Sequence, residues 1–196
     1  MDTTSRLCLK IKPGRVSRFV MLFQRGFLVR VPPGVTLDDV LRDAGFSRKY
    51  LDERVQTIFL DGSVVDEPQS EPVRDGSSIA LSAALPGLAG AIFRKGNTLS
   101  VLRSATAKRP DTRTEQGRLG IARIKLYNVV AEEMGPELLG TGVLVKRSEL
   151  EEEFAARRDL LETSITEAEL DGEKVEPATL FKKNFASSEH ISLFIS

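Results

Sequence analysis

Short apolar runs separated by turn residues dominate this sequence, and such runs are typical of β-strands. In the first half of the chain, two runs flank a turn at Gly26, and a third leads into a turn at Asp61-Gly62. An alternating segment after Asp75-Gly76 predicts a last strand. The strands predicted for this half occupy residues 19–23, 27–31, the positions leading up to 60, and 77–82.

One helix is predicted between the second and third of these strands. Thr36 and Asp39 have the spacing of a helix start at which polar side chains satisfy the first free backbone N–H groups. Apolar residues then recur at helical spacing along one face, and Gly45 ends the pattern. The first half therefore predicts the order strand, strand, helix, strand, turn, strand.

The second half predicts the same order at similar spacing. Ser148 and Glu151 stand in the relation of Thr36 and Asp39, and apolar residues at helical spacing follow them. Before this helix, residues 124–145 predict a hairpin with a long connection that contains glycine and proline. The final strand is predicted at the end of the chain. There Ile191 and Leu193 match Ile79 and Leu81 of the first half.

A short motif also recurs 110 positions apart. Its members are Leu60, Asp61, Gly62 and Val65 in the first half, and Leu170, Asp171, Gly172 and Val175 in the second. Glycine after a strand favours a turn with positive φ, and aspartate can accept a hydrogen bond from the backbone that follows it. We therefore predict a duplicated domain in which Asp61, Gly62, Asp171 and Gly172 are structural turn residues.

This order of elements, with LDG at a strand turn and Asp75-Gly76 before a last strand, resembles the ubiquitin-like β-grasp superfamily. It is most similar to the sulfur-carrier branch, which includes the molybdopterin-synthase small subunit and the thiamine-biosynthesis carrier. The resemblance covers residues 18–83 well and residues 121–196 less well, because FASSEH replaces the second DG. It implies fold rather than activity, since β-grasp modules serve many functions.

The resemblance implies an α+β protein of two β-grasp domains, each with a mixed sheet packed on one helix. We expect the first domain at 1–103, including an extra hairpin at 91–103, and the second at 118–196. Residues 104–117 lack apolar periodicity and predict a flexible basic linker between the two domains.

Carriers of this branch act through a free C-terminal Gly-Gly, whereas this sequence ends in Ile195-Ser196. We expect a non-catalytic protein that presents surfaces to a protein partner, because small β-grasp sheets expose one face and an edge. One alternative is a sulfur carrier or modifier processed near Gly87 and Gly90. Another is a protein that binds a small ligand between the domains or in the apolar segment 79–93.

Composition argues against two classes of partner. The 28 basic and 28 acidic residues cancel, so no net field attracts nucleic acid or membrane. The basic residues around the linker have no aromatic neighbours on which bases could stack, and they are Lys108, Arg109, Arg113 and Arg118. The uncharged run 79–93 is shorter than the roughly 18–20 residues of a membrane span.

The residues able to carry chemistry are few. Cys8 is the only cysteine and lies in an alternating strand pattern, so we expect a small apolar side chain and a reducing, cytoplasmic location. His190 is the only histidine and begins the last predicted strand, so we expect an exposed edge residue without metal-ligand partners. We therefore expect no enzyme activity, no metal and no cofactor.

Overall fold

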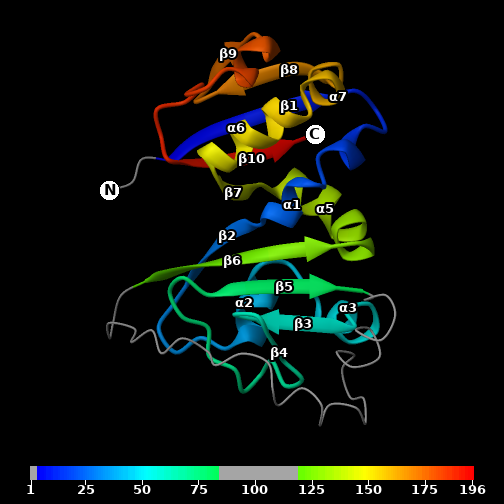
Figure 1. Cartoon of the computed structure of the whole chain (residues 1–196), viewed down its shortest axis with the longest axis vertical. Coiled ribbons are helices and arrows are strands. Elements are labelled where there is room, and N and C mark those ends of the chain that lie inside the picture. The colour runs from blue at the N-terminus through cyan, green and yellow to red at the C-terminus, as the bar shows by residue number, and fades with distance from the viewer. Residues whose placement is uncertain (1–3, 84–118) are drawn as a thin grey trace. The chain divides into compact units, whose positions relative to one another are not determined.

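The chain folds into an α+β structure, which a computed structural model describes for residues 4–83 and 119–196 (Figure 1). The chain divides into two compact units. Unit 1 comprises residues 1–28 and 131–196, and unit 2 comprises residues 29–130. This division differs from the expected boundaries, because β1 pairs with strands from the end of the chain. The expected linker at 104–117 and hairpin at 91–103 lie outside the described residues.

The elements of unit 1 come from two separate stretches of sequence. They are β1 (Thr4–Ile11), η1 (Val16–Arg18), α1 (Leu22–Arg25), α5 (Val129–Thr141), β7 (Val143–Lys146), α6 (Arg147–Ala156), α7 (Arg158–Glu162), β8 (Ile165–Leu170), β9 (Glu173–Val175), η3 (Pro177–Phe181) and β10 (His190–Ile195). Unit 2 is continuous. Its elements are β2 (Phe27–Val31), which begins in unit 1, then α2 (Leu37–Asp43), α3 (Arg48–Glu53), β3 (Thr57–Leu60), β4 (Ser63–Val64), β5 (Ser78–Ser82) and β6 (Gly120–Tyr127).

The described strands form a single mixed sheet rather than the two separate sheets expected from the sequence. Their hydrogen-bonded order is β4-β3-β5-β6-β2-β7-β10-β1-β8-β9. Leu28, the last residue of the first stretch of unit 1, pairs with Leu144 of β7. The sequence did not reveal this order because no local signal shows that β1, at the start of the first half, pairs with β8 and β10 of the second half.

The two units share the same order of antiparallel and parallel strand pairs, counted from the terminal hairpin inward. In unit 2, β4 and β3 are antiparallel, β3 and β5 are antiparallel, and β5 and β6 are parallel. In unit 1, β9 and β8 are antiparallel, β8 and β1 are antiparallel, and β1 and β10 are parallel. The repeat seen in the sequence thus corresponds to two similarly ordered groups of strands.

The match between the last strands of the two halves is wrong, however. β5 lies beside β3, but the place beside β8 belongs to β1, and β10 lies one strand further in. Figure 1 shows β1 and β10, from opposite ends of the chain, running side by side. Leu7 and Leu9 of β1 are therefore the counterparts of Ile79 and Leu81, since all four are almost completely buried.

Two segments predicted as strand or connection are helical. The apolar run 19–23 follows η1 and forms a turn and the start of α1, which ends at Arg25 and is followed by Gly26 with φ +97°. The connection predicted between 128 and 142 is α5, whose buried residues include Val130, Met134 and Leu138 at four-residue spacing. A short apolar run does not distinguish a buried strand from a buried helix, and Pro136 within α5 concealed its helical pattern.

The two predicted helix starts behave differently. Thr36 caps α2 as expected, because its hydroxyl oxygen accepts a hydrogen bond from the backbone N–H of Asp39 at 3.2 Å. Ser148 does not cap α6, which begins one residue earlier at Arg147 and has no side-chain cap. The single predicted helix is also divided into α6 and α7, so the expectation of one helix per domain is wrong.

Both units have an extensive apolar core. In unit 2 the fully buried members of the core include Leu37, Leu41, Phe46, Ile58, Leu60, Ile79, Leu81, Ile124 and Leu126. In unit 1 they include Leu7, Leu9, Phe19, Phe23, Leu139, Phe154, Leu161, Leu180, Ile191 and Leu193. Alternate residues of the central strands thus point into a core that the helices complete.

The cap of α2 gives a prediction about pH and stability. The Thr36 hydroxyl donates to the Asp39 carboxylate at 2.6 Å, and this bond, together with Arg42, lowers the pKa of Asp39 below its ordinary value. Thr36→Ala should cost about 1 kcal/mol of unfolding free energy and raise the pKa of Asp39. Chemical denaturation and NMR titration of Asp39 measure these two effects.

The sign of the pH dependence follows from the lowered pKa. Asp39 contributes stability above its unfolded pKa, and this contribution is lost as the pH falls through the folded pKa. The stability difference between wild type and Thr36→Ala should therefore shrink in acid. Ser47→Ala removes the cap of α3 and is the matched control, because it should cost a similar amount without moving the pKa of Asp39. An unchanged Asp39 titration in Thr36→Ala would contradict this account.

Candidate functional site

The predicted turn residues hold neighbouring strands together. Asp61 and Gly62 connect β3 to β4 with φ of +52° and +80°, and Asp171 and Gly172 connect β8 to β9 with φ of +53° and +88°. Both aspartates therefore adopt the left-handed conformation, which aspartate tolerates better than most residues. The two pairs belong to different units.

Each aspartate bonds to an adjacent strand rather than to the backbone that follows it. Asp171 accepts a hydrogen bond from the Arg6 backbone N–H at 2.7 Å and donates its own N–H to the Arg6 carbonyl. Asp61 makes the same pair of bonds with Ser78. The expected Asx-turns are thus replaced by a clamp that fixes the strand beside the hairpin. This is a structural role for both motifs.

The other residues singled out in the sequence do not belong to these turns. Gly87 and Gly90 lie outside the described residues, as do Lys108, Arg109, Arg113 and Arg118. His190 is only 8% exposed, so the expectation of an exposed edge residue is wrong. The physical reason is that β10 is an internal strand, in which His190 pairs with Thr4 of β1 and with Lys146 of β7.

Cys8 lies at the centre of a sheet surface that the sequence did not identify. Along β1 and β10, one set of alternate side chains is buried in the core, and the other set points to the opposite face. Strand register places Cys8 beside Phe194 on one side and beside Glu169 on the other. Ser192 lies between Arg6 and Leu144 in the same way.

We call this surface the open face of unit 1, because its side chains are exposed or half-exposed. Its members are Arg6, Cys8 and Lys10 of β1, Leu144 and Lys146 of β7, Glu167 and Glu169 of β8, Lys174 of β9, and Ser192 and Phe194 of β10. The half-exposed residues Cys8, Leu144 and Phe194 give it an apolar centre. The charged residues surround that centre.

The orientation of Phe194 depends on Gly142, the residue just before β7. A Cβ at Gly142 would overlap Cε1 and Cζ of the Phe194 ring. Gly142 also has φ +98°, which disfavours any other residue. The ring therefore lies across the backbone at Gly142. The guanidinium of Arg6 lies over it, with Cζ 4.5 Å from the ring centroid.

The charged residues of the open face are paired unequally. Lys10 forms a salt bridge with Glu167 at 3.1 Å, and the hydrogen bond from Lys10 lowers the pKa of Glu167. Within residues 4–83 and 119–196, the side chains of Arg6 and Lys146 make no ion pair. Two cations thus stand near the apolar centre without carboxylate partners in the described chain.

Two other features of unit 1 carry less chemistry. Glu153 is 8% exposed and binds both Arg25, at 3.3 Å, and Arg157, at 3.1 Å, which is a structural link between α1 and α6. An open groove of about 410 Å³ lies at the junction of α6 and α7, and residues 155–160 line it. It is separate in sequence from the segment 79–93, which the alternative of a ligand-binding protein named.

The signal for the open face was present in the sequence but was not interpreted. Leu193, Phe194 and Ile195 are three successive apolar residues in a strand that otherwise alternates, so one of them had to point away from the core. Leu144 stands in the same position between Val143 and Val145. An apolar residue in the outward phase of a strand indicates a surface that is not simply solvated.

The chain was compared with protein-family models, curated proteins and solved structures. It matches no protein-family model, and neither the curated proteins nor the solved structures give a significant match. Among the described residues, no group of His, Cys, Asp and Glu side chains is arranged to hold a metal ion. Every described helix is too short or too polar to cross a bilayer.

The clamp on β1 predicts a difference between two substitutions at one position. Asp171→Ala removes the acceptor for the Arg6 N–H and places alanine at φ +53°, so it should cost about 2 kcal/mol of unfolding free energy. Asp171→Asn keeps an oxygen acceptor and tolerates the same φ, so it should cost less than half as much. Chemical denaturation measures both, and equal losses would argue against the clamp.

The contact between Gly142 and Phe194 predicts a second effect. Gly142→Ala combines an unfavourable φ with overlap of the ring, so we expect a loss of about 2–4 kcal/mol in unfolding free energy. Gly140→Ala is the matched control, because a Cβ there meets nothing within 4 Å and alanine favours a helix. Adding Phe194→Ala to Gly142→Ala should recover part of the loss in a double-mutant cycle. If the two losses simply add, the ring does not occupy the space beside Gly142.

Proposed function

We propose that this protein is a non-catalytic interaction module that binds a protein partner through the open face of unit 1. The observation that carries this proposal is the apolar centre formed by Cys8, Leu144 and Phe194 on a sheet surface whose opposite side is buried in the core. Aromatic and aliphatic side chains in the outward phase of a strand offer contact area that a partner can desolvate.

We further propose that each unit is a module of the ubiquitin-like β-grasp type. The order of strand directions supports this proposal, because in each unit a central parallel pair is followed outward by two antiparallel neighbours. In unit 1, the N-terminal strand β1 and the C-terminal strand β10 supply the parallel pair. A sheet that has helices on one side presents its other side to a partner.

Rigidity also favours binding at this face. The open face lies on hydrogen-bonded strands rather than on loops, and Arg6 and Phe194 hold each other in one arrangement. Side chains already held in their bound positions lose less conformational entropy when a partner arrives. The free edge of unit 1 is β9, a strand of only three residues, so it offers little backbone for strand addition.

The single cysteine of the chain allows a direct test. We would attach a photoreactive benzophenone to Cys8 and irradiate the protein in lysate of its source cell. We expect a discrete protein to be cross-linked. The yield should fall in Leu144→Thr, which removes apolar surface while keeping a residue suited to a strand. Mass spectrometry of the cross-linked band reads out the result.

The control label is placed at Lys12→Cys in a Cys8→Ser background, because Lys12 is exposed just after β1 and is not part of the open face. Specific binding gives the cross-linked protein from position 8 and not from position 12. The same products from both positions, or none from position 8, would count decisively against the proposal. Circular dichroism confirms that each labelled variant is folded.

A further inference from the structure

Arg6 at the open face differs from four of the other arginines of unit 1. Arg25, Arg147, Arg157 and Arg158 each form a salt bridge with a glutamate of the same unit. Arg6 is exposed, and within the described residues its guanidinium makes no hydrogen bond or ion pair and lies over the Phe194 ring. A guanidinium has five N–H donors in a fixed plane, so Arg6 presents unused donors beside an apolar surface.

The position of this guanidinium is set by the surrounding backbone. Gly142 makes room for the Phe194 ring, and the ring in turn supports the cation. The backbone of Arg6 is fixed by its two hydrogen bonds to Asp171. Arg6 is therefore held ready for an anion, and forming that contact requires little reorganisation.

Register fixes what else a ligand of Arg6 would meet. Arg6, Ser192 and Leu144 lie in one row across three neighbouring strands, and adjacent strands are about 4.8 Å apart. Phe194 lies in the next row on the open face, and Lys146 lies in the row on the other side of Leu144. The apolar centre is thus flanked by Arg6 on β1 and by Lys146 on β7.

Toward β8 the charges of the open face are balanced. Glu167 pairs with Lys10, and register places Glu169 between Cys8 and Lys174. An acidic partner group is therefore attracted more strongly toward Arg6 and Lys146 than toward β8. The face therefore distinguishes partners by charge as well as by shape.

We infer that the partner segment of the open face carries an apolar side chain flanked by acidic side chains. The apolar side chain packs on Phe194 and Leu144, and the flanking carboxylates bind Arg6 and Lys146. An extended segment rises about 3.3 Å per residue, so acidic and apolar residues two to four positions apart span these groups. This inference rests on the proposed function, and it names the partner's chemistry at the same surface.

The test uses a displayed library of random twelve-residue peptides, selected on the full chain in low salt. We expect the selected peptides to be enriched in Asp or Glu within four positions of an aromatic or aliphatic residue. A synthetic peptide from this set should bind Arg6→Glu at least about tenfold more weakly than wild type, because one attraction becomes a repulsion. Fluorescence anisotropy measures the affinity.

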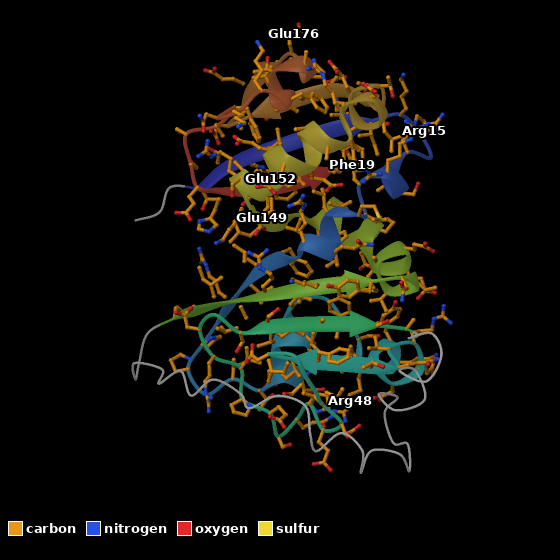
Figure 2. All side chains as sticks on the ribbon, viewed as in Figure 1. Arg15, Phe19, Arg48, Glu149, Glu152 and Glu176 are labelled. Carbon is orange, nitrogen blue, oxygen red and sulfur yellow. The ribbon has the colours of Figure 1, made fainter. Side chains whose placement is uncertain are left out.

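The matched control is Arg15→Glu, which makes the same change of charge at an exposed residue after β1 that is not a member of the open face (Figure 2). We expect Arg15→Glu to change peptide affinity less than threefold. Leu144→Thr should weaken peptide binding although it does not change the charge of the open face. Thermal unfolding of the three variants establishes that they are folded before binding is compared.

The outcomes separate this inference from the proposed function. The selected peptides could lack acidic residues and bind Arg6→Glu as well as wild type but fail to bind Leu144→Thr. That result would overturn the inference while the open face remained a protein-binding site. Selected peptides that bind Arg6→Glu and Leu144→Thr as tightly as they bind wild type would overturn both the inference and the proposed function. Binding to anionic phosphatidylserine vesicles or to poly(U) RNA that Arg6→Glu abolishes, with no peptide selected, would also overturn the inference.

Discussion

The insertion of β1 between β10 and β8 is the interaction on which unit 1 depends. Six consecutive residues of β1 pair in register with β10, and its other edge pairs with β8. The pairing continues beyond the strand, because Ser196 donates its N–H to the Leu9 carbonyl and accepts from the Ile11 N–H. Without β1, the two strands on either side of it would each have an unpaired edge.

The same strand supplies both faces of the sheet. Leu7 and Leu9 are almost completely buried and contribute to the core, whereas Arg6 and Cys8 point to the open face. The clamp from Asp171 fixes the backbone at Arg6 and so sets where the guanidinium stands over the Phe194 ring. A turn motif that looks purely structural in the sequence therefore also positions the candidate binding surface.

Local features of the fold were predictable from the sequence, because their signals are local. The cap at Thr36 and the strands at 77–82 and 190–196 were predicted from residues within one element, and the structure confirms them. The helix α5 was missed because Pro136 and neighbouring glycines masked its apolar spacing. The pairing of β1 with β10 joins Thr4 to His190 and Leu9 to Ile195, from opposite ends of the described chain, and no local pattern encodes it.

The candidate site was only partly accessible for the same reason. Phe194 and Leu144 can each be recognised as apolar residues in the outward phase of a strand, but their neighbours depend on the strand order. Arg6 comes near Phe194 only because the first and last strands are parallel neighbours. A sequence-based comparison of the two halves placed β10 in the position that β1 occupies, and so it could not bring these residues together.

The discontinuity of unit 1 has a consequence for the order in which the chain folds. The whole of unit 2 lies in the sequence between the two stretches of unit 1. During synthesis, unit 2 is complete before β7 to β10 exist, whereas β1 must wait until its neighbours β8 and β10 have left the ribosome. Domains generally fold as units in the order in which they are made, so unit 2 folds first and β1 closes unit 1 last. Until then, the alternating strand TSRLCLKI has no partner, and the nascent chain is most exposed to aggregation through this strand.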